Sequence, residues 1–191
     1  MYTIEQAGSA EQTLQKSHFI ARVSQTTSEQ HALQFLRAIA TQHVSAHHLA
    51  YAYRIKTPNG IVPRFSDAGE PSGTAGKPIL QILEGRELIN VCVGVLRYYG
   101  GINLGTGGLA RAYSGTAKLA LETALIMPFI EMQELTLKVA YSRIDELTRL
   151  VLQLKGKVLN KVFADGAQLT ISLPIAHINN IKKRFHEKSF L

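Results

Sequence analysis

Polar and apolar positions alternate or recur at helical spacing through the first two thirds of the chain. Alternation over residues 18–26 and 47–56 predicts two strands. Between them, Ser28 is a suitable N-cap for a helix whose apolar face extends to about residue 43. Residues 88–98 are apolar on both faces, which predicts a central strand. A short helix over residues 79–83 and a long one over residues 109–125 complete this part.

Pro128 follows the long helix, so we expect a domain boundary at residues 127–132. The remaining pattern predicts strand, helix, strand, strand and helix, over residues 133–141, 144–154, 156–163, 167–173 and 174–186. This order is that of a ferredoxin-like domain that lacks its last strand, unless residues 189–191 supply a short one. The sequence therefore predicts an α+β protein with two domains, residues 1–128 and 132–191.

Two segments are rich in glycine, and neither resembles an ordinary turn. Residues 64–78 have almost no core-forming side chain, which predicts a long functional loop. Residues 100–108 contain five glycines between a strand and a helix, where backbone N–H groups can face an anion. The alternative is a crossover that needs glycine only for its backbone geometry.

Two familiar nucleotide motifs are excluded by their context. Residues 105–110 fit the glycine pattern of dinucleotide sites, but Glu122 lies within the following helix rather than at the end of a second parallel strand. Gly76 and Lys77 resemble part of a phosphate-binding P-loop, but Pro71 and Pro78 occupy positions that need glycine and a hydroxyl residue.

Basic and aromatic residues flank the glycine segments and suit phosphate contact and base stacking. We therefore expect one anion- or nucleic-acid-binding surface. Its candidate residues are Thr74, Lys77, Arg97, Tyr98, Tyr99, Gly100, Gly101, Gly105, Thr106, Gly107, Gly108 and Arg111. In the alternative interpretation, the tyrosines are half-buried and Arg111 forms an ion pair with Asp67 or Glu70.

Asp67 and Glu70 are the weak candidates for acid–base catalysis, since they lie in one loop with hydroxyl and basic groups. The interpretation that the sequence favours is instead a loop held by its own hydrogen bonds and caps. The spacing of histidine and acidic residues predicts no metal site, and no cofactor motif is present.

The charge balance favours an anionic partner. Lys and Arg outnumber Asp and Glu by 21 to 14, a net charge of +7. A secondary basic surface is expected in the second domain, at Lys155, Lys157, Lys161, Lys182 and Lys183. The single Cys92, in an apolar run, and the lack of a signal peptide or membrane span predict a cytoplasmic protein that does not bind membranes.

Residues 65–78, 95–101 and 104–109 together resemble the IMPACT/YigZ family, and residues 16–21 are similar to its N-terminal signature. The resemblance covers the whole chain. It implies a first domain similar to domain IV of elongation factor G and a ferredoxin-like second domain similar to its domain V. It also implies a role linked to translation, for which the biochemical activity is not established.

Three functions remain open from the sequence. The first is a non-catalytic module that binds RNA or the ribosome and regulates translation. The second is an enzyme for a small phosphorylated or acidic ligand, which predicts a raised pKa for Asp67 or Glu70. The third is a regulator that binds a protein partner through an apolar patch or a free sheet edge. The oligomeric state is not predicted.

Overall fold

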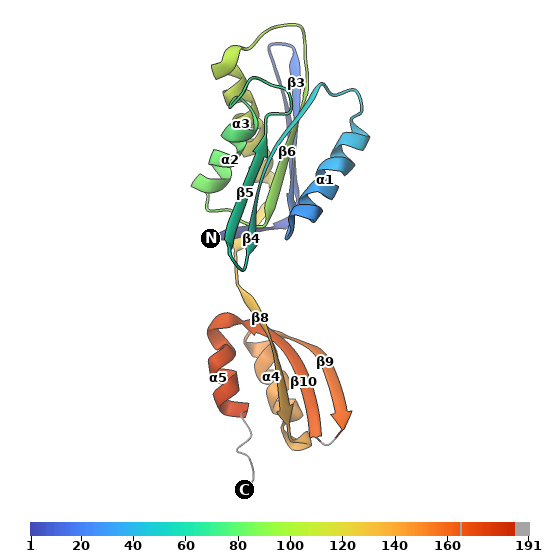
Figure 1. The fold of residues 1–191 in the computed structure, drawn as a ribbon, viewed down its shortest axis with the longest axis vertical. Helices are drawn as coiled ribbons and strands as arrows, with labels where there is room; N and C mark the ends of the chain where they lie inside the picture. The colour runs from blue at the N-terminus through green and yellow to red at the C-terminus, as the bar shows by residue number, and fades with distance from the viewer. Residues whose placement is uncertain (165, 186–191) are drawn as a thin grey trace. The chain divides into compact units, whose positions relative to one another are not determined.

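The computed structural model describes residues 1–164 and 166–185 and divides into two compact units, Met1–Phe129 and Ile130–Leu191 (Figure 1). The mixed α/β character expected from the sequence is confirmed. Within the described part, no helix has both the length and the apolarity needed to cross a membrane.

The first unit is built on a five-stranded antiparallel sheet in the order β2-β3-β6-β4-β5. Its strands are β2 (Gly8–Leu14), β3 (Ser17–Gln25), β4 (His48–Thr57), β5 (Gly60–Ser66) and β6 (Val91–Tyr98). Strand β6 is central and almost wholly buried, as the sequence predicts for a strand that is apolar on both faces.

Three helices cover the two faces of this sheet (Figure 1). They are α1 (Glu29–Gln42), α2 (Gly76–Gly85) and α3 (Gly105–Thr123). Helices α2 and α3 pack on one face over a core that includes Phe19, Val93 and Tyr113. Helix α1 begins at its Ser28 N-cap, as predicted, and packs on the other face. A two-stranded sheet of β1 (Tyr2–Gln6) and β7 (Leu125–Pro128) joins the ends of the unit.

The long loop expected at residues 64–78 is shorter than predicted. Strand β5 continues to Ser66 because it pairs with β4 along its length, and α2 already begins at Gly76. Pro63 obscured the strand in the sequence; an edge strand accepts proline because one side of its backbone forms no ladder bonds. The strands β1, β2 and β7 were also not predicted, since short strands carry little periodic signal.

Helix α3 begins at Gly105, four residues before the predicted start, and ends at Thr123, before the short strand β7. Three of the five glycines expected in a loop, Gly105, Gly107 and Gly108, therefore lie at the start of the helix. Gly105 itself has a φ of 69°, a conformation that favours glycine. The glycine-rich segment is thus a short loop followed by a glycine-rich helix start.

The second unit has the predicted order of elements. It contains β8 (Met132–Val139), a 3-10 turn (Tyr141–Arg143), α4 (Ile144–Gln153), β9 (Lys157–Ala164), β10 (Gly166–Pro174) and α5 (Ile175–Phe185). The antiparallel sheet has the order β8-β10-β9, and both helices pack on one face over a core of its own that includes Leu169. A final strand at residues 189–191 falls outside the described residues.

Candidate functional site

Asp67 organises the segment between β5 and α2. Its Oδ1 accepts hydrogen bonds from the backbone N–H groups of Ala75 (3.0 Å) and Gly76 (2.8 Å), and its Oδ2 accepts one from Gly73 (2.8 Å). Burial by itself would raise the pKa of Asp67, but these N–H donors outweigh it and hold the pKa below its ordinary value. Asp67 therefore caps the start of α2, and its low pKa opposes the prediction of a raised one.

Glu70 lies in a buried ion pair with Arg97. The two side chains are 4% and 5% exposed, and Arg97 Nη1 donates to Glu70 Oε1 at 2.8 Å and to Oε2 at 3.1 Å. The Tyr113 hydroxyl on α3 also donates to Glu70 Oε1, at 2.7 Å. Burial, and then this bond to Glu70, raises the pKa of the Tyr113 hydroxyl. Arg97 is thus held inside the unit and is not a surface contact for phosphate.

The residues around this ion pair tie it to neighbouring loops. Arg97 Nη2 donates to Ser17 Oγ at 3.3 Å, and the same oxygen accepts the Gly100 N–H at 3.3 Å. His48 Nδ1 lies 2.9 Å from the carbonyl oxygen of Ala68, so Nδ1 carries the proton of this bond. The cluster joins β3, β4, β6 and α3 and reaches the glycine-rich loop through Ser17, so its role is structural.

Tyr98 and Tyr99 do not form one stacking surface. Tyr98 packs on the side of the sheet covered by α1, where its hydroxyl lies 2.9 Å from His43 Nδ1. Tyr99 follows the end of β6, is 39% exposed, and has the Arg97 guanidinium 5.0 Å from its ring centroid. Of the two tyrosines expected to stack on bases, Tyr99 alone is at the glycine-rich loop.

The first turn of α3 presents an exposed, uncapped backbone. Gly105, Thr106 and Gly107 are exposed. Leu104 stands at the N-cap position without a side-chain cap, and the first turn contains no acidic residue. Helix N-termini with free N–H groups and a positive dipole attract anions. Helix α2 differs, because Asp67 already occupies its N-terminus.

Three exposed cations lie on segments that contact the glycine-rich loop or belong to the packed helices α2 and α3. Lys16, in the turn between β2 and β3, contacts the glycine-rich loop, since a Cβ on Gly100 would meet the Lys16 carbonyl oxygen. Lys77 lies in the first turn of α2, and Arg111 in the second turn of α3. Among the described residues, none of these three cations forms an ion pair. The alternative in which Arg111 pairs with Asp67 or Glu70 is therefore not observed.

The other candidates are placed as follows. Thr74 is buried and its hydroxyl donates to the Pro71 carbonyl at 2.6 Å, so it stabilises the loop before α2. Gly100 is half-buried, Gly101 is exposed with a φ of 84°, and Gly108 faces Leu104 within α3. Fewer of the predicted surface residues are therefore exposed than the sequence indicated.

The secondary basic surface is divided between two places. Lys157 and Lys161 lie on the edge strand β9, and Lys155 precedes it. Lys182 and Lys183 lie on α5, which packs over β8 and β10, whereas α4 packs over β9. Strand β9 and helix α5 therefore lie on opposite sides of this unit (Figure 1), and the five lysines do not form one patch.

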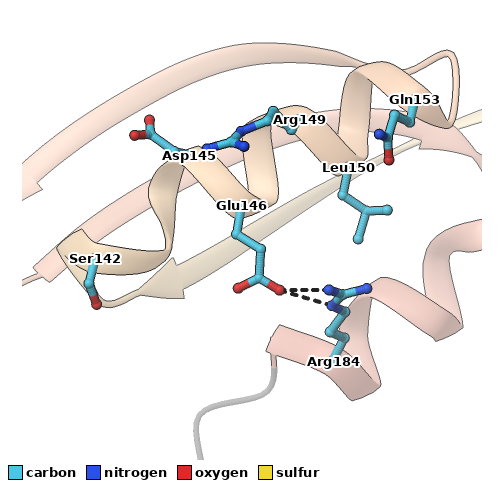
Figure 2. Close-up of a pocket in the computed structure, with 7 residues that line it drawn as sticks. All are labelled: Ser142, Asp145, Glu146, Arg149, Leu150, Gln153 and Arg184. Atoms are coloured by element: carbon cyan, nitrogen blue, oxygen red, sulfur yellow. Dashed lines mark hydrogen bonds and ion pairs between the residues drawn. The ribbon is translucent and has the colours of Figure 1, made fainter.

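A groove of about 410 Å³ lies between α4 and α5 in the second unit (Figure 2). Glu146 points into it and binds Arg184 at 2.8 Å and Arg143 at 3.0 Å. Hydrogen bonds from Arg143 and then Arg184 lower the pKa of Glu146. The lining carries the acids Asp145 and Glu146 and the arginines Arg149 and Arg184, so its charges balance and the groove does not favour an anion.

Sequence reasoning missed the parts of the site that depend on long-range contact. Tyr113, Ser17 and His48 meet Glu70 or Arg97 from three separate elements, and no spacing in the sequence predicts these meetings. Lys16 was also missed, although its place beside a strand start could have suggested an exposed turn. No group of three or more metal-ligating side chains is found in the described part of the chain.

Comparison with known proteins gives consistent matches. Residues 15–121 match the Impact N-terminal domain. The IMPACT family member YvyE of Bacillus subtilis is 46% identical over 112 residues, which are 59% of this chain and about half (51%) of that protein. The family member YigZ of Escherichia coli is 35% identical over 86% of this chain and 81% of that protein. A crystal structure described as a hypothetical protein is similar with a TM-score of 0.73 and 31% identity, covering 98% of this chain and 92% of that one.

Proposed function

This chain belongs to the IMPACT family, and from that premise we propose that it is a translation-associated regulatory protein that binds RNA, free or within the ribosome. The start of α3 carries this proposal. It presents exposed, uncapped N–H groups without a nearby acid in its first turn, a combination that suits a phosphate. No chemical step is assigned to the protein.

The charges around α3 support a polyanion over a single small anion. Lys16 comes from the β2–β3 turn, Lys77 from α2 and Arg111 from α3, and all three are free of ion pairs in the described part of the chain. Cations spread over several elements can follow a phosphate backbone, whereas a small ligand needs them convergent in a pocket. Tyr99, exposed at the same loop, adds a ring on which a base can stack.

The enzyme alternative has less support. Asp67 is held as a carboxylate by three backbone donors, and Glu70 is taken up by Arg97 and Tyr113. A general acid or base needs a free proton-accepting or proton-donating atom within reach of its substrate. Neither carboxylate is placed for that role.

The test is RNA binding measured by fluorescence anisotropy with a labelled single-stranded oligonucleotide, between about 50 and about 200 mM salt. We expect binding that weakens with salt. Lys77→Ala and Arg111→Ala should each weaken it about threefold or more and reduce the salt slope by about 0.7. Arg37→Ala is the matched control, because Arg37 is exposed on α1, on the opposite face of the sheet.

The control should bind as the unchanged protein does. No RNA affinity at the lowest salt, or an equal loss in Arg37→Ala, would contradict the proposal. Copurification with and without nuclease separates this function from the protein-binding alternative, since a partner held through RNA is released by nuclease.

Two finer features follow as part of the same proposal. The second unit is ferredoxin-like and similar to domain V of elongation factor G, which its β-α-β-β-α order with β10 in the centre supports. The first unit is similar to domain IV of that factor. A role in translation places the protein in the cytoplasm.

A further inference from the structure

We propose that the groove between α2 and α3 receives one unstacked base of single-stranded RNA, with the adjoining phosphate on Arg111. The inference rests on the RNA-binding function proposed above and adds the place and chemistry of base recognition. The groove has a volume of about 380 Å³ and is lined by Pro78, Gln81, Ile82, Ala110, Arg111 and Ser114.

The groove offers apolar surface to the face of a base. Pro78, Ile82 and Ala110 contribute apolar side chains from two packed helices. Pro78 is buried, whereas Ile82 and Ala110 are half-buried and each keeps a surface that a ligand can cover. Every base has an apolar π-face, and its transfer from water onto such an apolar surface is favourable.

Polar groups at the same groove suit the edge of a base. Gln81 is exposed, and no hydrogen bond engages its side chain in the described part of the chain, so its amide can both donate and accept. The Ser114 hydroxyl donates to the Ala110 carbonyl at 2.6 Å, which leaves its oxygen lone pairs free to accept. An edge that carries both donors and acceptors therefore finds partners here.

The charge of the groove suits a nucleotide. Arg111 is its only charged lining residue and has no carboxylate partner in the described part of the chain. Its Nη1 lies near Gly107, 3.5 Å from where a Cβ would stand, so the guanidinium lies beside the exposed first turn of α3. The α4–α5 groove is similar in size, but Asp145 and Glu146 balance Arg149 and Arg184 on its lining, so it offers a phosphate no net positive charge.

An acidic peptide is the main competing occupant, because it could also place a carboxylate on Arg111. A nucleotide is favoured because the groove is continuous with basic groups of the proposed RNA surface. Its lining residue Pro78 follows Lys77, and its lining residue Arg111 lies beside the first turn of α3. A phosphate backbone can contact these groups in succession while one base turns into the groove. Protein binding is treated as an outcome of the test.

The test compares two probes on the full chain: a single-stranded RNA oligonucleotide and an abasic oligonucleotide of the same length. Ala110→Leu fills the groove, and Gln81→Ala removes the polar edge. The matched controls are Ala38→Leu and Gln34→Ala at exposed positions of α1. All four changes keep residues that are compatible with a helix, and circular dichroism verifies folding.

We expect the unchanged protein to bind the base-carrying probe about fivefold or more tightly than the abasic probe, because the base buries apolar surface. Ala110→Leu should abolish this preference and leave the abasic affinity unchanged. Gln81→Ala should reduce the preference, and both controls should retain it.

Equal affinity of the unchanged protein for both probes, or a preference that survives Ala110→Leu, overturns the base site while the RNA-binding function stands. Failure of both probes to bind overturns the RNA-binding function and the base site with it. If Ala110→Leu releases a protein partner from nuclease-treated extracts but leaves both RNA affinities unchanged, the groove is a peptide site and the inference is wrong.

Discussion

Asp67 and Glu70 show how the same residue type acquires different roles from its partners. Asp67 accepts hydrogen bonds from three backbone N–H groups and acts as a cap. Glu70 accepts hydrogen bonds from the Arg97 guanidinium and the Tyr113 hydroxyl, and so joins β6 to α3. Removing one partner of a buried ion pair costs about 3–5 kcal/mol, because the other charge stays buried. Both acids are therefore expected to matter first for the shape of the glycine-rich site.

The Asp67 cap makes the stability of the protein depend on pH. Its folded pKa is lowered, so the stabilisation is complete above the ordinary value of 3.8 and is lost as pH falls through the folded pKa. Asp67→Asn should cost about 1–2 kcal/mol at neutral pH, since its amide nitrogen faces an N–H donor. Urea unfolding of both proteins tests this, because the difference between their free energies of unfolding should shrink below pH 3.8. A difference that is independent of pH would contradict it.

At the scale of elements, helix α2 depends on a close approach to β5. A Cβ on Gly76 would meet the carbonyl oxygen of Ser66, whereas one on Gly85, at the other end of the helix, would meet nothing within 4 Å. Of the two glycines of this helix, only Gly76 is therefore required for packing. Gly76 allows the backbones to touch, and Gly85 is a replaceable end residue.

Gly76→Ala should therefore lower the free energy of unfolding by about 1–3 kcal/mol, as overpacking does. Gly85→Ala should change it little or raise it by up to about 1 kcal/mol, because alanine favours the helix. Chemical unfolding followed by circular dichroism measures both. Similar effects of the two substitutions would show that backbone contact with Ser66 does not limit this helix.

At the scale of the whole molecule, each unit has a separate hydrophobic core. Leu83 is fully buried in the first and Leu169 in the second. The second unit is small, so its core is marginal and single changes there should have large effects. The candidate RNA site lies within the first unit and uses no core residue of the second.

Leu169→Ala should destabilise the second unit by about 2–5 kcal/mol and leave the first one intact. Hydrogen exchange followed by mass spectrometry should then show faster exchange beyond residue 130 and unchanged exchange before it. Leu83→Ala is the reciprocal control and should reverse the pattern. Faster exchange throughout the chain in either variant would mean that the two units unfold together.

The sequence by itself determined the elements with strong periodicity and the family. The Ser28-capped helix, the central strand and the β-α-β-β-α order all follow from local patterns of capping and alternation. Edge strand β5 and the early start of α3 did not, because proline and glycine conceal elements that pairing and packing stabilise. Local signals do not include the partner strand.

Only the tertiary structure decided which candidate residues share a surface. Arg97, Tyr98 and Tyr99 are adjacent in sequence, yet one is buried with Glu70, one packs beneath α1 and one is exposed. Side chains of a strand alternate between faces, and burial depends on what covers each face. Lys16, Lys77 and Arg111 are distant in sequence, yet folding brings Lys16 to the glycine-rich loop and packs the helices of Lys77 and Arg111 together, and none of the three forms an ion pair in the described part of the chain.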